Sequence, residues 1–516
     1  MNKKIVLQNE SDFLGFLDVI DERNFQQRTP KDFKNLKKIF SMVGYPMTIV
    51  YEPVYVDRVF RDSFYLYYAG KYNAIDRNCK RLAFFKGVIR DFNQPNIENI
   101  LQEQFVGISV IKPLSRGRLG RTLLNPGKLK IRKCYLRLTE FEFTILDYHL
   151  KLKAFPFSSQ DGETMTCAET SLWDILEYFS HQYAEYRSIL PSDIHRSLES
   201  ISQQRNLPST GLHFGKISLL LKEYGFAPRI YAANGNSGYS DEDIRRAFHY
   251  YIESGIPIVV GVAGELNIRH SIVCIGHGKE RKEIVEENIT PITYKGRNVP
   301  YIDSADLYDE YVVMDDNSYP YAINSYEKLP AFGDAKVELF IVPLYKRVFL
   351  EAQDIQQLFI SIMEHSELSI LKMLKNIDEE INNENPLISR FFLTSSRKFR
   401  GFRNTNENAL NGKKIYQKVL YPKFVWVAEI FTRKSYEEGF AYGEIVFDAT
   451  ALRYGDLAEC IIMLRYLSNF GYRYPEEDLK ELSGRMEKPV IGLNKKFPMY
   501  KNNLNEVGVD EHDSHR

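Results

Sequence analysis

Helical segments come before strands in the middle of this chain, between residues 155 and 345. Three stretches carry apolar residues at helical spacing: 167–179, 212–224 and 241–253. Four later apolar runs have the length of strands: 257–262, 271–275, 311–314 and 337–343. Because strands and helices do not alternate here, the pattern predicts an α+β fold in which the late strands form an antiparallel sheet.

Domains of mixed α/β structure are expected on both sides, since 516 residues exceed the usual size of one domain. We divide the chain into an N-terminal domain of unknown role (1–150), the α+β domain (151–345) and a C-terminal domain that binds substrate or a partner (346–516). The expected helices of the flanking domains are 33–40, 97–104 and 352–376. Their expected strands are 48–51, 105–111, 424–430 and 443–450, and the tail from Asn502 is expected to be loose. The polar segment 278–309 is interpreted as an insertion between two strands of the predicted sheet.

Charge is balanced along the chain, with 68 Lys and Arg residues against 68 Asp and Glu residues. Such a balance gives no general argument for binding nucleic acid or a membrane. No stretch approaches the roughly 18 apolar residues that span a bilayer. Residues 1–10 lack the apolar core of a signal peptide. We therefore expect a soluble cytoplasmic protein whose partner is a protein or peptide substrate.

Cysteines are few and widely separated, at positions 79, 134, 167, 274 and 460. None of them forms a CxxC pair, so neither a zinc site nor a disulfide framework is predicted. We expect no metal and no cofactor.

Four residues with complementary chemistry stand near the ends of the predicted elements: Gln160, Cys167, His270 and Asp315. A thiolate can attack a carbonyl carbon when an imidazole takes or holds the thiol proton. A third group then fixes the tautomer of the imidazole, and a side-chain amide can donate to the developing oxyanion. The sequence therefore predicts an acyl-transfer site in which Cys167 is the nucleophile, His270 the base and Gln160 the oxyanion donor, with Asp315 or one of the two residues after it as the orienting group.

The start of a helix at Cys167 supports its assignment as the nucleophile. Thr166 and Glu169 have the spacing of a capping box. A thiol in the first helical turn lies near free N–H groups and the positive end of the helix dipole, which favour a thiolate. The nearby acids Asp161 and Glu163 oppose this effect. A lone cysteine in such a position is more often a small buried residue, so the prediction depends on all four residues together.

Three other residues compete for the supporting roles. Asp316 and Asn317 are rivals of Asp315, because all three follow the strand 311–314. Strand alternation predicts that only one of the two acids can turn toward the histidine, but it does not decide which one. His277, between two glycines at the other end of the histidine strand, is interpreted as a turn residue, and its alternative role is that of the base.

Two basic segments, 113–122 and 397–403, are interpreted as solvated loops. Their alternative use is contact with an anion or with an acidic peptide.

Residues 155–345 resemble the papain-like cysteine peptidases, most nearly the bacterial branch of bacteriocin-leader-processing (double-glycine-type) peptidases. The pieces that carry the resemblance are Gln160, Cys167-Ala168, Gly211-Leu212, Gly255 to Val260, Arg269 to Val273 and Val312 to Asp315. The spacing departs from that family in two places. Gln160 stands seven residues before Cys167, one more than usual, and the interval from His270 to Asp315 is longer than in the leader peptidases.

The resemblance implies a papain-like fold, in which a helical part carries the cysteine and an antiparallel sheet carries the histidine and aspartate. It implies hydrolysis of a peptide or isopeptide bond by Cys167, His270 and Asp315, with Gln160 in the oxyanion hole. The same thiol chemistry serves deamidases, transglutaminases and enzymes that remove a conjugated protein tag. A catalytically inactive scaffold that binds a partner is the third possibility.

Overall fold

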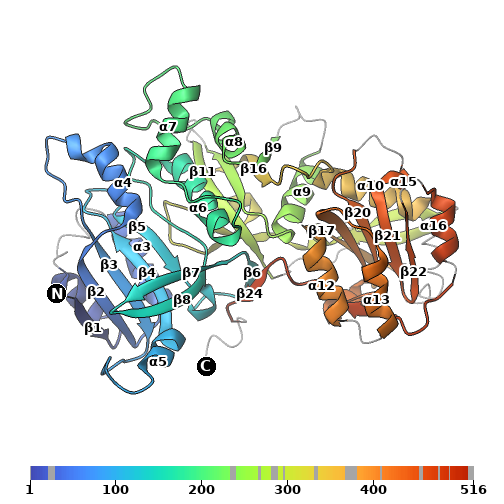
Figure 1. Cartoon of the computed structure of the whole chain (residues 1–516), viewed down its shortest axis with the longest axis horizontal. Helices are drawn as coiled ribbons and strands as arrows, with labels where there is room; N and C mark the ends of the chain where they lie inside the picture. Colours follow the sequence, from blue (N-terminus) through green and yellow to red (C-terminus); the bar gives the residue numbers. More distant parts are fainter. Residues whose placement is uncertain are drawn as a thin grey trace.

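The computed structural model describes residues 2–20, 30–232, 240–264, 269–279, 289–294, 297–329, 335–365, 381–406, 410–452, 457–474, 477–486 and 488–509. The chain is elongated, with its N-terminal part at one end and the sheet built from its last third at the other (Figure 1). The structure is of the α+β type, with three large sheets in which nearly all neighbouring strands are antiparallel.

The first sheet belongs to the N-terminal part and has the order β1-β2-β3-β4-β5. Its strands are β1 (Lys3–Leu7), β2 (Met47–Tyr55), β3 (Cys79–Lys86), β4 (Phe105–Ile111) and β5 (Leu119–Leu124). Alternate residues of β2 face opposite sides of the sheet. Ile49 packs in the cluster that contains helix α3 (Pro30–Val43), whereas Val50 packs against the hairpin β7 (Thr139–Ile145) and β8 (Tyr148–Ala154). Helix α3 is therefore held on one face of this sheet, where it can contact the middle of the chain.

The second sheet has the order β15-β14-β11-β10-β16-β9. Its strands are β9 (Ala227–Ala232), β10 (Ile258–Ala263), β11 (Arg269–Gly278), β14 (Glu310–Met314), β15 (Ala322–Ser325) and β16 (Lys336–Leu344). Helix α6 (Cys167–Gln182) contacts β11 on one face, and α9 (Asp241–Glu253) contacts it on the other. This central sheet is consequently buried on both faces.

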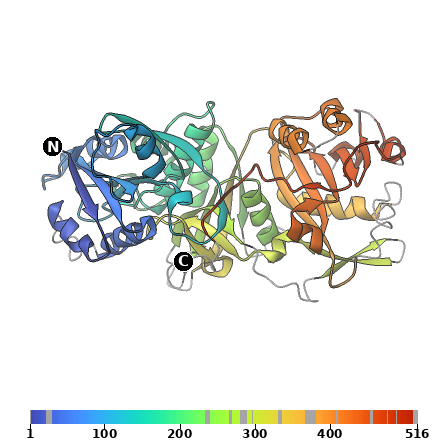
Figure 2. The ribbon, with the colours of Figure 1, turned by 90° about the horizontal axis from the view of Figure 1, so that it is seen from below.

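The third sheet has the order β12-β13-β17-β18-β20-β21-β22. Its strands are β12 (Thr290–Tyr294), β13 (Arg297–Asp303), β17 (Leu387–Ser395), β18 (Phe424–Thr432), β20 (Gly443–Asp448), β21 (Ile461–Tyr466) and β22 (Asn469–Tyr472). Figure 2 shows this sheet, with its helices, separated from the first sheet by the central one. The strands β19 (Phe440–Ala441) and β23 (Phe497–Pro498) form a small ladder beside it.

The remaining helices lie around these sheets. They are α1 (Asp12–Val19), α4 (Arg58–Leu66), α5 (Ile97–Gln104), α7 (Pro191–Ile201), α8 (Phe214–Glu223), α10 (Ala352–Glu364), α12 (Ser396–Asn406), α13 (Leu410–Lys418), α14 (Arg433–Glu438), α15 (Leu457–Cys460) and α16 (Leu479–Met486). None of the helices in the described residues is both long enough and apolar enough to cross a lipid bilayer.

Strands from one predicted domain pair with strands from another, so the sheets do not follow the expected domain limits. Strand β6 (Cys134–Leu136) pairs with β11 of the central sheet, and β24 (Asn505–Val507) pairs with β6. Strands β12 and β13, from the segment 278–309, instead join the third sheet, and β13 lies parallel to β17. The expected limit at residue 150 falls inside β8.

Most of the predicted helices and strands are present, but three predictions about loops are wrong. The basic segment 113–122 is not a solvated loop throughout, because residues 119–122 lie in β5 and Arg118 is buried. The described part of the tail, residues 502–509, is not loose, because β24 pairs with β6. The basic segment 397–403 is not a loop but lies in α12, where Phe399 and Arg403 are buried. The helix expected over 352–376 is present as α10 up to Glu364, and residues 366–376 lie outside the described ranges.

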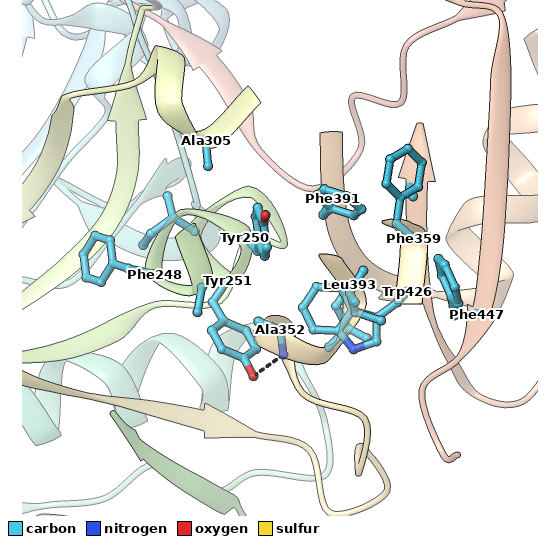
Figure 3. Close-up of a cluster of buried hydrophobic side chains, with 14 of the residues drawn as sticks. Phe248, Tyr250, Tyr251, Ala305, Ala352, Phe359, Phe391, Leu393, Trp426 and Phe447 are labelled. Carbon is cyan, nitrogen blue, oxygen red and sulfur yellow. Dashed lines mark hydrogen bonds between the residues drawn. The ribbon is translucent and has the colours of Figure 1, made fainter. Parts of the chain in front are cut away.

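One hydrophobic cluster continues from the central sheet into the third sheet (Figure 3). Tyr251 of α9 lies beside Trp426 of β18, with ring centroids 5.7 Å apart. The Tyr251 hydroxyl accepts a hydrogen bond from the backbone N–H of Ala352 at 3.2 Å, and the Trp426 indole N–H donates to the carbonyl of Leu350 at 2.8 Å. The two aromatic side chains thus satisfy their polar atoms while they join the two sheets.

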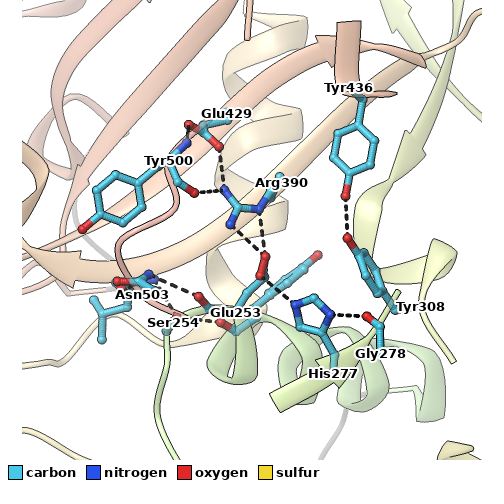
Figure 4. Close-up of polar contacts among 12 residues, drawn as sticks. Glu253, Ser254, His277, Gly278, Tyr308, Arg390, Glu429, Tyr436, Tyr500 and Asn503 are labelled. Carbon is cyan, nitrogen blue, oxygen red and sulfur yellow. Dashed lines mark hydrogen bonds and ion pairs between the residues drawn. The ribbon is translucent and has the colours of Figure 1, made fainter. Parts of the chain in front are cut away.

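A buried ionic network crosses the same junction (Figure 4). Arg390 of β17 donates to Glu253 of α9 at 2.9 Å and to Glu429 of β18 at 2.7 Å. It also donates to the carbonyl of Tyr500 at 3.0 Å. Glu429 accepts a further hydrogen bond from Arg403 at 2.6 Å. All four charged side chains are at least nine-tenths buried, so each depends on its partners for stabilisation.

Removing the central cation of this network should destabilise the protein strongly. Arg390→Ala leaves Glu253 and Glu429 buried with fewer partners, and breaking a buried pair in this way costs about 3–5 kcal/mol. Arg433→Ala is the matched control, because its pair with Glu437 is partly exposed and worth less than about 1 kcal/mol. Urea unfolding of both variants measures the difference. Equal stability of the two variants would contradict the role given to Arg390.

Candidate active site

A tightly hydrogen-bonded loop carries Gln160 toward the start of α6. The carboxylate of Asp161 accepts hydrogen bonds from the backbone N–H groups of Glu163, Thr164 and Met165 at 2.7–2.9 Å. The backbone N–H groups of Asp161 and Gly162 donate to the carbonyl of Met165. The loop therefore has a fixed conformation between Gln160 and Cys167.

Gly117, in the basic turn after β4, holds this loop from the other side. Its φ of 56° lies in the left-handed region, and a Cβ atom there would stand 1.8 Å from the carbonyl oxygen of Gln160. Only glycine allows this close approach. The segment 113–122 thus positions Gln160, a role that the sequence did not reveal because the contact joins two distant parts of the chain.

Cys167 is the first residue of α6, as the capping pattern predicted. Glu169 accepts a hydrogen bond from the backbone N–H of Thr166 at 3.2 Å, and also binds the Thr166 hydroxyl. Cys167 is half-buried, whereas the four other cysteines are buried. It is therefore the most accessible thiol of the chain.

His270 lies at the start of β11 and reaches the end of β14. Its Nε2 atom is 2.9 Å from Oδ1 of Asp315. The Cys167 thiol is a further hydrogen-bonding partner of the imidazole. Because Nε2 is engaged by Asp315, Nδ1 is the ring nitrogen available to the thiol. The structure thus places the predicted nucleophile, base and orienting acid in a connected series.

The charges around His270 favour its protonated form. Burial lowers the pKa of His270, but the hydrogen bonds with Asp315 and Cys167 and the negative charges of Asp316 and Asp315 outweigh this effect and raise it to about 10. Asp315 shows the complementary effect: burial raises its pKa, yet the bond to His270 leaves it below the usual value. An imidazolium–carboxylate pair is expected at neutral pH.

The prediction that only one acid turns toward His270 is wrong. Oδ1 of Asp316 lies 3.4 Å from Nε2, close behind the 2.9 Å of Asp315. Strand β14 ends at Met314, so both acids lie in the following turn, where strand alternation no longer applies. Burial raises the pKa of Asp316 to about 7. Neither of its oxygens has a hydrogen-bond partner among the described residues.

Asn317 links the glutamine to the histidine. Its Oδ1 accepts a hydrogen bond from Nε2 of Gln160 at 3.0 Å, and the Lys31 amine also donates to this oxygen. Its Nδ2 lies 3.2 Å from Nε2 and 3.4 Å from Nδ1 of His270. A protonated imidazole offers only N–H groups, so this amide N–H lies against the ring without a hydrogen bond to it. One of the two amide hydrogens of Gln160 is used in this contact, and the other is available to a ligand. Asn317 is therefore a positioning residue, not the acid that pairs with the imidazole.

A cleft with a volume of about 910 Å³ is lined by all four predicted site residues. Its opposite wall is α3, which contributes the exposed lysines Lys31, Lys34, Lys37 and Lys38 at helical spacing. Lys37 is paired with Glu10 at 2.9 Å. Lys34 and Lys38 form no ion pair with any residue that the structure describes. The N-terminal domain thus gives the cleft a positively charged wall.

His277, the other candidate base, is not a turn residue, because it lies buried at the far end of β11, where it pairs with both β14 and β6. Its Nδ1 is 2.7 Å from the carbonyl of Gly278, and its Nε2 faces Glu253 at 3.4 Å (Figure 4). Seven residues of extended strand separate it from His270, a distance of about 23 Å. It belongs to the junction with the third sheet and is too far away to act on Cys167.

A divalent cation is the other species that these residues could hold. One ligand atom each from His270, Asp315 and Asp316 lies within 4.8 Å of the others. An imidazole and two carboxylates are suitable ligands for zinc or a similar ion. The same charges also suit an imidazolium, which already bonds directly to Asp315.

No protein-family model matches this chain, and the search of curated proteins finds no match to it. Its function must therefore be argued from the site itself.

The pKa of His270 should depend mainly on Asp315. Its C–H resonance, assigned with a His270→Ala variant, should titrate near pH 10 and not near the ordinary 6.5. Since the folded state holds this proton more tightly, the pair stabilises the fold fully below pH 6.5, and this contribution is lost as the pH rises through about 10. Asp315→Asn should lower the midpoint by more than one unit and Asp316→Asn by less. A wild-type midpoint below 7 would contradict this account.

Proposed function

We propose that this protein is a cysteine peptidase that hydrolyses a peptide or isopeptide bond with Cys167 as the nucleophile. The observation that carries the proposal is the series from Cys167 through His270 to Asp315, set in one cleft with Gln160. Such a series of nucleophile, base and orienting group is the general requirement of nucleophilic catalysis.

The first chemical step would be attack of the Cys167 sulfur on the substrate carbonyl. A protonated His270 stabilises the thiolate and then gives its proton to the leaving amine, so that an acyl-enzyme forms and the amine departs. Water then attacks the thioester with His270 as the base, which releases the carboxylic acid and restores the thiol. Asp315 keeps Nδ1 of the imidazole directed at the sulfur throughout.

The oxyanion would be stabilised by two donors near the helix start. One is the free amide hydrogen of Gln160, and the other is the backbone N–H of Cys167, which has no carbonyl acceptor within the helix because it is the first helical residue. Loss of one such donor commonly costs about 10²–10³ in rate. The fixed loop between Gln160 and Cys167 supplies the preorganisation that this stabilisation needs.

An acidic polypeptide segment is the substrate that the cleft favours. The α3 wall carries lysines, while the acids of the described part of the cleft, Glu10 and Asp315, are already paired with Lys37 and His270. A carboxylate-rich substrate would gain electrostatic attraction at Lys34 and Lys38.

A metal-dependent hydrolase is the second candidate, favoured by the arrangement of His270, Asp315 and Asp316. In that enzyme the cysteine would not be essential, and activity would depend on a bound divalent ion. The two candidates therefore differ in what the activity requires: the thiol of Cys167 in the first and a bound divalent ion in the second.

Selective alkylation tests the thiol mechanism. Iodoacetamide at pH 7 should modify Cys167 before the four buried cysteines, and His270→Ala should slow this modification at least about tenfold because the imidazolium no longer stabilises the thiolate. His149→Ala, an exposed histidine in β8, is the matched control and should change nothing. Mass spectrometry of the digested protein gives the rates. Equal reactivity in the wild type and in His270→Ala would contradict the proposal.

Cleavage of a peptide library tests both the reaction and the substrate. We expect products cut next to Asp- and Glu-rich segments, with none from Cys167→Ser, and no effect of a chelator. The double variant Lys34→Glu/Lys38→Glu should lose the acidic preference and raise KM about tenfold, while iodoacetamide labelling stays unchanged. Lys336→Glu/Lys346→Glu, which alters exposed lysines outside the cleft, is the control. A mass gain of about 1 Da without cleavage would indicate deamidation instead.

A further inference from the structure

A second cavity, with a volume of about 780 Å³, lies between the central and third sheets. It is lined by residues from the end of α6, the end of β17, the start of α12 and the start of β18. This volume falls within the range of sites for small molecules. None of the four predicted site residues lines it.

Arg137 is a buried cation in the wall of this cavity, with only 7% of its surface exposed. Its Nε donates to the Tyr178 hydroxyl at 2.6 Å, and its Nη1 donates to the carbonyl of Asn503 at 2.9 Å. Both acceptors are neutral, and no described carboxylate pairs with the guanidinium. The remaining amino group, Nη2, has no acceptor among the described residues. Buried charges are normally paired, so this side chain lacks a counter-ion.

Lys398 of α12 is a second cation without a counter-ion that lines this cavity. It forms no ion pair with a described residue. Burial and the positive charge of Arg137 together lower its pKa to about 8. Two partly desolvated cations therefore repel each other across the cavity, and an anion between them would relieve that repulsion.

The start of α12 adds donors to this site. The helix runs for 11 residues from Ser396, and its first turn contains no acidic residue. The N–H of Ser396 donates to the carbonyl of Lys423 at 3.1 Å and that of Lys398 to the Ser395 hydroxyl at 3.3 Å. The N–H of Arg397 and the positive end of the helix dipole remain to favour an anion at this position. The acid that lines the cavity, Glu185, is paired at 3.6 Å with Lys423, and more than half of each side chain is exposed.

Part of the cavity wall is aromatic. The rings of Tyr345 and Phe424 are stacked with centroids 4.4 Å apart, and both residues line the cavity. Tyr183 continues this wall and accepts a hydrogen bond from the Tyr345 hydroxyl at 2.9 Å. A flat or apolar group could pack here while a charged group reached the cations.

We propose that this cavity binds a small phosphate monoester, with the phosphate between Arg137, Lys398 and the start of α12 and the organic group against Tyr345 and Phe424. Phosphate fits better than a carboxylate because it carries close to two negative charges at neutral pH and offers three oxygens to three sets of donors. The site is separate from the Cys167 cleft and does not depend on the function proposed for it.

Calorimetric titration of the full chain with phenyl phosphate tests the site. We expect saturable binding that is at least tenfold tighter than that of inorganic phosphate at matched ionic strength, because the ring gains the aromatic wall. Lys398→Met should weaken binding at least tenfold, and Lys398→Arg should retain it. Lys434→Met, an exposed lysine near the start of α14, is the matched control and should bind like the wild type.

The pH dependence provides a second readout that does not rely on a substitution. Binding to the wild type should weaken between pH 7 and pH 9, as Lys398 loses its proton, whereas Lys398→Arg should stay constant over this range. No saturable binding, or equal affinity in Lys398→Met and the wild type, would overturn the proposal. Equal affinity for phenyl phosphate and inorganic phosphate would overturn the aromatic part of it.

Discussion

The burial of the central sheet on both faces is the constraint on which the rest of the structure depends. Along β11, Val273 and Ile275 pack in the cluster that contains α6 and α3, whereas Ile272 and Cys274 pack in the cluster that contains α9 and the third sheet. Each half of the molecule therefore uses alternate residues of the same strand. A change of register in β11 would exchange these two sets and disturb both cores at once.

The same strand positions the candidate site through its antiparallel pairing with β14. Val273 pairs with Met314, so the residues just before Val273 stand beside the residues just after Met314. His270 consequently meets Asp315, Asp316 and Asn317 in the turn. The site carries three buried acids, because Asp174 of α6 lies close enough for its charge to interact with that of Asp316. Burial raises the pKa of Asp174 well above its usual value and that of Asp316 to about 7, which limits the negative charge that surrounds the imidazolium.

Helix α6 connects the two cavities of the protein. It begins at Cys167 in the first cleft and ends at Gln182 in the wall of the second. Sixteen residues of helix place these ends about 24 Å apart. Both cavities are formed between parts of the chain that build different sheets, the first between α3 and the central sheet and the second between the central and third sheets. Their positive charge comes largely from the flanking parts of the chain, although the chain as a whole is neutral.

Local signals determined much of what the sequence could predict. The capping pair Thr166 and Glu169 marked the start of α6, and apolar periodicity identified α9, β10 and the pairing partners β18 and β20. The chemistry of residues near the ends of the predicted helices and strands also indicated a site, and the structure places its four members around one cleft: Gln160, Cys167, His270 and Asp315. All of these signals act within a few residues of chain, where propensity and hydrogen bonding are decided locally.

Only the tertiary structure decided the contacts between distant segments. The lysines of α3 face Cys167, Gly117 packs on the carbonyl of Gln160, and β24 pairs with β6, yet none of these pairs is close in sequence. The basic segment 397–403 became a helix because Phe399 and Arg403 found a core and the buried acids Glu429 and Glu444. The sequence thus determined which residues could perform chemistry. Packing determined which charges and backbone atoms surround those residues, because these surroundings come from segments that are far apart along the chain.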